Sequence, residues 1–181
     1  MSKRPVIDRD MVLDAAENVV MQQGVAALTI GEVARAAGIS KGGVQSCFGT
    51  RDGLVEAMFN RWKAEFETTV RTIAEDEADP QERLRAHVAL MAGSDEGLGQ
   101  RAAAILAAMH SNEGLRQQAS DWYRPLLLQA EGDDDKSRNT RLAFLAAKGA
   151  FLLRSFGIME MSDSEWQTIF REINSLLDAA D

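Results

Sequence analysis

Residues 29–54 read TIGEVARAAGISKGGVQSCFGTRDGL, and they predict the local structure of this part of the chain. Thr29 followed three positions later by Glu32 has the pattern of a capping box, in which the threonine hydroxyl accepts a hydrogen bond from an exposed N–H and the glutamate reaches back. Gly38 is expected to end that helix with a positive φ, which glycine adopts at little steric cost. Ser40 can cap a second short helix. The stretch therefore predicts two short helices joined by a tight turn.

The apolar residues of this stretch are spaced to pack the two helices against each other, which leaves the polar positions of the second helix on the outside. A helix-turn-helix presents such positions to the major groove of DNA. Residues 33–51 also carry a net charge of +3, which suits contact with phosphates. A helix pair that only packs inside an all-helical protein has the same spacing, so the spacing by itself leaves that alternative open. The residues expected in the shared core are Val33, Ala37, Ile39 and Val44.

The composition excludes several classes of protein. The 181 residues are 45% hydrophobic and 27% charged, as in ordinary globular proteins. The single cysteine, Cys47, cannot form an intrachain disulfide, which excludes a disulfide-rich scaffold. No apolar run is long enough to span a bilayer, and no apolar stretch follows Lys3 and Arg4, so we expect neither a membrane partner nor a signal peptide. These features predict a cytoplasmic protein. Its net charge of -8 falls mostly on residues 61–181.

Helical periodicity and helix start signals continue along the rest of the chain. Ser162 and Glu165 repeat the capping-box pattern before the final helix, and Pro125 is expected to kink the helix that contains it. We therefore predict an all-α fold of about nine helices without a strand. Besides the two short helices, the others are expected at about 8–24, from 50 onward, from 79 onward, after Gly97–Gly99 as far as His110, around Pro125, and at about 135–157 and 163–179.

The stretch quoted above resembles the DNA-binding region of the TetR/AcrR transcriptional regulators, whose usual pattern runs T…IA…AGVSKGTLYHYFPSKEAL. Gln45 stands in place of a tyrosine that commonly contacts phosphate, and Cys47 in place of a second aromatic residue or histidine. The resemblance implies a helix-turn-helix DNA-binding domain over residues 1–50, with a flexible arm at 1–7, and a larger helical effector-binding and dimerisation domain over 51–181. The matching residues are Thr29, Val33, Ala34, Ala37, Gly38, Ile39, Ser40, Lys41, Gly42, Val44, Phe48, Arg51 and Leu54.

The resemblance also implies a DNA-facing surface on the second short helix. Lys41 and Gln45 are expected to read bases, and Thr29 and Arg51 are expected to contact phosphates. Phe48 is expected in the core. The full predicted DNA-binding set is Thr29, Ser40, Lys41, Gly42, Gly43, Gln45, Ser46 and Arg51.

The last two predicted helices have the composition of a dimer interface. Apolar residues recur every three or four positions near the C-terminus, and the preceding helix carries alanines small enough for close helix packing. The resemblance implies a homodimer, whose two-fold symmetry suits a palindromic operator. Packing of the same faces inside one chain is the alternative. The predicted interface residues are Ala147, Ala150, Phe151, Trp166, Ile169, Phe170, Ile173 and Leu177.

An effector cavity is the second feature that the resemblance implies for the larger domain. Aromatic residues and methionines supply its expected apolar wall, and a few polar groups would orient the ligand. Every one of these residues could equally be plain core. The predicted effector-binding residues are Trp62, Phe66, Met91, Met109, His110, Trp122, Tyr123 and Phe151.

Together these features predict a ligand-responsive regulator that binds double-stranded DNA, in the form of a homodimeric repressor released from its operator by a small apolar or mixed-polarity effector. We expect no cofactor. An enzyme is disfavoured because two histidines and one cysteine form no recognised metal-binding motif and no glycine-rich phosphate loop is present. The alternative that stays open is a helical protein-interaction module that has lost specific DNA binding, because of Gln45 and Cys47.

Overall fold

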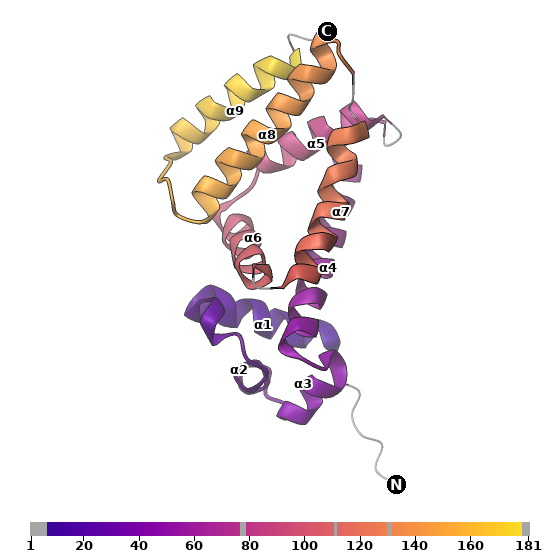
Figure 1. Ribbon diagram of the computed structural model, residues 1–181. Coiled ribbons are helices and arrows are strands. Elements are labelled where there is room, and N and C mark those ends of the chain that lie inside the picture. Colours follow the sequence, from indigo (N-terminus) through magenta and orange to yellow (C-terminus); the bar gives the residue numbers. More distant parts are fainter. Residues whose placement is uncertain (1–6, 77–78, 111, 130–131, 179–181) are drawn as a thin grey trace. The chain divides into compact units, whose positions relative to one another are not determined.

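A computed structural model describes residues 7–76, 79–110, 112–129 and 132–178 of the chain. Within these ranges the protein forms nine α-helices and a short 3-10 helix, η1 (Val25–Ala27), and no β-strand (Figure 1). The predicted all-α fold is confirmed. All but the last residue of the arm expected at 1–7 lies outside the described residues. The helices are α1 (Arg9–Gln23), α2 (Ile30–Ala36), α3 (Lys41–Phe48), α4 (Arg51–Ile73), α5 (Pro80–Ala92), α6 (Glu96–Met109), α7 (Glu113–Gln129), α8 (Asp135–Ser155) and α9 (Asp163–Asp178).

The helix starts follow the predicted capping residues closely. Thr29 Oγ1 accepts a hydrogen bond from the N–H of Glu32 (3.1 Å), and Ser40 Oγ accepts one from the N–H of Gly43 (3.1 Å). The prediction that Glu32 reaches back to the backbone at the start of α2 is wrong. Its carboxylate instead accepts hydrogen bonds from Arg35, one turn later in the same helix. Before α9, Ser162 and Glu165 exchange both predicted hydrogen bonds.

The position of α6 differs from the prediction. This helix was expected to follow Gly97–Gly99, whereas it begins at Glu96 and includes both glycines. The side chain of Asp95 provides the start, since its Oδ1 accepts a hydrogen bond from the N–H of Leu98 at 2.8 Å. An aspartate at this position satisfies one of the free N–H groups of a first helical turn.

Backbone contacts divide the chain into two compact units, which we describe separately. The first unit contains the residues up to Trp62 together with Ala104–Leu115, and the second contains Lys63–Ala103 and the residues from Arg116 onward. The helix α4 contributes to both. The predicted domain boundary between residues 50 and 51 stays a prediction.

The first unit contains the helix-turn-helix. The turn between α2 and α3 passes through Gly38, whose φ of 66° is a left-handed conformation that other residues adopt only with strain. The carbonyl of Ala34 accepts a hydrogen bond from the N–H of Ile39 (3.0 Å), which closes the turn. Apolar side chains from α1, α2, α3 and the start of α4 form one core beneath this turn. The largest fully buried members are Val12, Val19, Leu28, Val33, Leu54, Met58 and Phe59.

In the second unit, α8 packs against both α5 and α9, and α8 and α9 lie side by side in Figure 1. Two long-range hydrogen bonds join α5 to α9: Arg85 Nη2 donates to the carbonyl of Leu177 (2.9 Å), and Trp166 Nε1 donates to the carbonyl of Ala92 (3.0 Å). These bonds satisfy backbone carbonyls near the ends of both helices, where no intrahelical partner exists. None of the described helices has the length and apolar character needed to cross a membrane.

Candidate DNA-binding surface and aromatic cluster

The helix α3 presents its polar side to solvent and its apolar side to the core of the first unit. Val44 and Phe48 are buried, as predicted for Phe48. The predicted DNA-binding residues on the opposite side are all at the surface: Ser40, Lys41, Gly42, Gln45 and Ser46 are exposed, and Gly43 is half-buried. The structure therefore brings six of the eight predicted residues together along one helix and its cap.

Lys41 begins α3, and its side chain passes over the start of α2. A Cβ atom added to Gly31 would lie 2.8 Å from Lys41 Cε and 3.2 Å from Lys41 Nζ. Any side chain at position 31 would therefore push the lysine aside. Gly31 thus leaves room for the Lys41 side chain to lie over α2.

The two predicted phosphate contacts lie at the edges of this surface. Thr29 is exposed, and its hydroxyl oxygen caps α2. Arg51 is half-buried, because its Nε donates to the carbonyl of Leu28 (2.9 Å) while Nη1 lies 3.7 Å from Asp52 Oδ1. Arg51 therefore also links the start of α4 to the segment before α2, a structural role that the sequence pattern did not indicate.

A further basic residue at this surface was missed by the sequence analysis. Arg9, the first residue of α1, places its guanidinium 4.5 Å above the ring of Phe48 and donates a hydrogen bond to the carbonyl of Cys47. A cation near the last carbonyls of a helix is favourable. Arg9 thus adds a positive charge at the C-terminal end of α3. No local pattern reveals this contact, because it joins residues 38 positions apart.

The predicted effector-binding residues are divided between the two units. Trp62, Met109 and His110 belong to the first unit, where His110 is exposed. Phe66, Met91, Trp122, Tyr123 and Phe151 belong to the second. Of these five, the structure brings three into mutual contact: the ring of Trp122 lies 5.8 Å from that of Phe66, edge to face, and 4.5 Å from that of Tyr123.

Three residues that the sequence analysis did not select complete this group, namely His87 of α5 and Phe144 and Lys148 of α8. The ring of His87 lies 5.0 Å from that of Phe66 and 5.7 Å from that of Phe144. Lys148 Nζ lies 4.7 Å from the ring centre of Phe66, 5.1 Å from Tyr123 and 5.5 Å from Phe144. We call these residues the aromatic cluster: Phe66, His87, Trp122, Tyr123, Phe144 and Lys148.

The position of Lys148 is unusual for a lysine. Burial lowers the pKa of its ammonium group to about 7, and the charge of Glu67 opposes that shift. Glu67 itself accepts hydrogen bonds from Trp122 Nε1 and from Arg83 Nη2. Among the described residues Lys148 forms no ion pair; its side chain is half-buried, and its ammonium group lies over the faces of three rings, which attract a cation.

His87 is fully buried, and in the described part of the chain neither ring nitrogen has a hydrogen-bond partner. Burial, reinforced by the charges of Lys148 and Arg83, lowers its pKa to about 3, so the ring is neutral at pH 7. Thr140, which lies two turns before Lys148 on α8, is also fully buried with an unpartnered hydroxyl. An unpaired buried polar group costs about 1–3 kcal/mol, which makes these groups candidates for binding a polar ligand.

A helical spacing in the sequence could have revealed part of this cluster. Thr140, Phe144 and Lys148 are spaced by four residues, which places them on one face of α8. The sequence analysis instead selected the alanines of that helix for a dimer interface.

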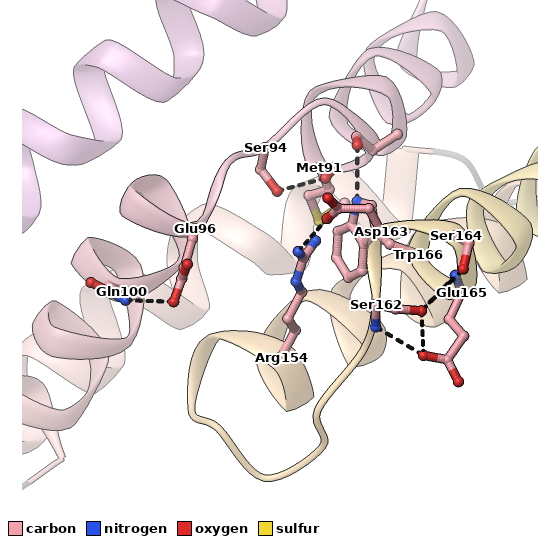
Figure 2. A network of polar contacts seen from close by, with 11 residues as sticks. Met91, Ser94, Glu96, Gln100, Arg154, Ser162, Asp163, Ser164, Glu165 and Trp166 are labelled. Carbon is pink, nitrogen blue, oxygen red and sulfur yellow. Dashed lines mark hydrogen bonds and ion pairs between the residues drawn. The ribbon is translucent and has the colours of Figure 1, made fainter.

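The predicted dimer residues are mostly covered by their own chain. Of the eight, only Ala150 and Ile169 keep partial exposure; the other six are buried in the second unit. Trp166 shows why: Figure 2 shows its side chain beside Arg154, whose guanidinium lies 4.7 Å above the indole and forms an ion pair with Asp163 at 3.1 Å. The apolar stripe of α9 therefore faces the inside of the second unit. For these six residues the structure agrees with the alternative interpretation, in which they pack within one chain.

Phe151 has a different environment from the aromatic cluster. It lines a small cavity of about 150 Å³ in the second unit, together with Arg154, Trp166 and residues at the start of α6. Within the described ranges, no group of three or more histidine, cysteine or acidic side chains is placed to bind a metal ion.

Two protein-family models match the chain and together cover most of it. Residues 12–58 match the model of bacterial regulatory proteins of the tetR family, and residues 81–178 match the model of a tetracyclin repressor-like C-terminal domain. The first match contains the helix-turn-helix described above, and the second contains α8 and α9.

Relatives and solved structures agree with these matches. The HTH-type transcriptional regulator BetI of Paraburkholderia phytofirmans is 39% identical over 88 residues, a match that covers 46% of this chain and 43% of the relative. A TetR transcription regulator from Haloarcula marismortui is 19% identical with a TM-score of 0.69, over 95% of this chain and 97% of that one. The multidrug binding protein EbrR, solved with malachite green, is 24% identical with a TM-score of 0.65, over 93% and 96%. The chain belongs to the tetR family of bacterial regulatory proteins.

Proposed function

We propose that this protein is a homodimeric repressor that binds a palindromic DNA operator and is released from it by a small effector. The observation that carries the proposal is α3, a short helix whose polar side is exposed and whose start holds Lys41. Arg9 adds positive charge at its C-terminal end, and Arg51 adds another at the start of α4. An exposed helix of this kind, with phosphate-binding charges at its borders, fits the major groove.

A homodimer explains how one eight-residue helix per chain gains enough affinity. Two copies related by a two-fold axis read two half-sites about 34 Å apart on one face of the duplex. The exposed side of α8 supports the contact between the copies, because Leu142 and Leu145 are each about half exposed and Phe156 follows just beyond the helix end. These residues replace the mostly buried set that the sequence predicted.

Effector release follows from linkage between two binding events. A ligand that prefers a conformation with wrongly spaced α3 helices lowers the affinity for the operator by the ratio of its own affinities for the two conformations. The helix α4 is continuous from Arg51, beside the helix-turn-helix, to Ile73, and it carries Phe66 of the aromatic cluster. That EbrR was solved with malachite green supports the binding of a small effector by this chain.

The test is a mobility-shift titration with DNA from upstream of the gene, at two salt concentrations. We expect specific binding that weakens with salt, because phosphate contacts release counterions. Lys41→Ala should weaken binding about tenfold and relax the sequence specificity, as expected for the loss of a base contact. Lys41 is a better target than Arg51, because the loss of Arg51 would also remove its structural hydrogen bond to the Leu28 carbonyl.

A matched control for charge is Arg138→Ala. Arg138 is an exposed residue of α8 that pairs with Asp135, so its removal changes the net charge equally without touching the helix-turn-helix. It should leave operator affinity unchanged. Failure of the wild-type protein to bind specifically at low salt would contradict the proposal and favour the interaction module that has lost DNA binding.

A further inference from the structure

Two polar side chains from different helices share one apolar environment in the second unit. Lys148 of α8 and His87 of α5 both contact Phe66 and Phe144, at ring distances between 4.7 and 5.7 Å. Tyr123 of α7 closes a third side around the Lys148 ammonium group. The ammonium group of Lys148 and the imidazole of His87 therefore border the same two aromatic rings.

The described residues leave these two side chains without polar partners. Both ring nitrogens of the fully buried His87 lack a hydrogen bond, and Lys148 forms no ion pair in the described part of the chain. The carboxylate of Glu67, whose charge acts on Lys148, already accepts hydrogen bonds from Trp122 and Arg83. The six residues of the cluster therefore offer two hydrogen-bond donors, the Lys148 amine and one N–H of the neutral imidazole, and include no carboxylate.

We propose that the aromatic cluster binds a small monocarboxylate with an apolar body. The carboxylate accepts hydrogen bonds from the Lys148 ammonium and from a ring N–H of His87, while the apolar body lies against Phe66, Tyr123 and Phe144. A charged carboxylate satisfies both donors at once, and charge-assisted hydrogen bonds of this kind are the strong ones. The inference rests on the proposed function, because it names the chemical class of the effector.

The position of Lys148 also argues against a cationic ligand. Aromatic faces bind cations, but here the lysine already occupies the faces of three rings. A cationic ligand at the same rings would be repelled by the positive charge of Lys148. A monocarboxylate instead gains an ion pair and keeps the apolar contacts.

The experiment is calorimetric titration of the purified full chain, without DNA, with three acids and their primary amides as probes. The acids are benzoate, 3-phenylpropanoate and hexanoate, and each amide keeps the shape of its acid without the charge. We expect at least one acid to bind ten times or more tightly than its amide. If no acid binds more tightly than its amide, including the case in which nothing binds, the proposal is overturned.

Variants then assign the binding to the cluster. Lys148→Met keeps the length of the side chain and should reduce the affinity for the acid at least tenfold, to the level of the amide. Lys136→Met, on the same helix, should leave it unchanged. His87→Phe keeps a ring in place and should reduce the affinity for the acid threefold or more with no effect on the amide. Unchanged acid binding by both cluster variants would overturn the assignment.

Operator release is measured separately, so the two proposals fail in different ways. An acid that binds the wild-type chain but leaves the operator complex intact supports the site and contradicts its role as the effector site. Release of the operator by a different ligand, when no acid binds, keeps the proposed function and overturns the carboxylate inference.

Discussion

His87 makes the stability of the protein depend on pH. Its pKa is lowered to about 3 in the folded chain, chiefly by burial, from a usual value of 6.5. Between these two values the unfolded chain binds a proton that the folded chain does not. The folded state therefore loses stability as the pH falls from 6.5 toward 3, and this contribution is constant above 6.5.

The substitution His87→Phe should remove this dependence. Phenylalanine fills a similar volume among Phe66 and Phe144, and it leaves no unpaired nitrogen. We expect the free energy of unfolding of the variant, relative to wild type, to rise by about 2 kcal/mol between pH 7.5 and pH 5, as measured by urea denaturation. The control is His110→Phe, at an exposed position. A difference that stays the same at both pH values would show that His87 accepts a proton in the folded chain.

At the scale of single residues, the sequence predicts whether a side chain is exposed better than it predicts which residues that side chain contacts. The exposure of Lys41 and Gln45 and the burial of Phe48 follow from helical periodicity, which assigns each residue to a face. The contact of Arg9 with Phe48 and that of Lys148 with Phe66 could not be predicted this way, because each joins helices far apart in the sequence. Periodicity identifies a face and says nothing of what covers it.

At the scale of the helices, the stability of α3 depends on its N-terminal cap. It has only eight residues, and Gly42 and Gly43 each weaken it by about 1 kcal/mol relative to alanine. Ser40 Oγ accepts a hydrogen bond from the N–H of Gly43, one of the N–H groups that has no partner within the helix. The cap therefore offsets part of the cost of the two glycines.

The substitution Ser40→Ala should destabilise the first unit by about 1 kcal/mol, because it removes this cap. Ser46→Ala is the matched change, since the Ser46 hydroxyl donates to the carbonyl of Gly43 within the same helix and caps nothing. We expect faster hydrogen exchange of the α3 amides in Ser40→Ala and little change in Ser46→Ala. Equal exchange in the two variants would mean that the cap contributes nothing measurable.

Helix starts were the most predictable part of the architecture, and α6 shows the limit. Thr29, Ser40 and Ser162 all cap the helices that they were predicted to cap, because a capping hydrogen bond is local in sequence. For α6 the sequence predicts a start after Gly97–Gly99, whereas both glycines lie within the helix. The energetic cost of a glycine is small enough for packing in the second unit to override it.

At the scale of the whole molecule, the homodimer that we propose uses a different face of the C-terminal helices from the one the sequence indicated. The stripe of α9 has the spacing of an interface, but Trp166, Phe170 and Ile173 are buried within the chain. A helix that packs on its own core shows the same periodicity as one that packs on a partner. Only the structure reveals that the outer side of α8 keeps large apolar side chains exposed, among them Leu142 and Leu145.

The substitution Leu145→Glu should therefore separate the dimer without unfolding the chain. Leu145 is 52% exposed, so a charged side chain is tolerated in one copy but is buried without a partner when two copies meet. We expect sedimentation to show a monomer at concentrations where wild type is a dimer, and operator affinity to fall more than tenfold because half-sites are then bound singly. Leu128→Glu, at a position of α7 that is 47% exposed, is the control and should stay dimeric. Dimers of Leu145→Glu as stable as those of wild type would place the interface elsewhere on the chain.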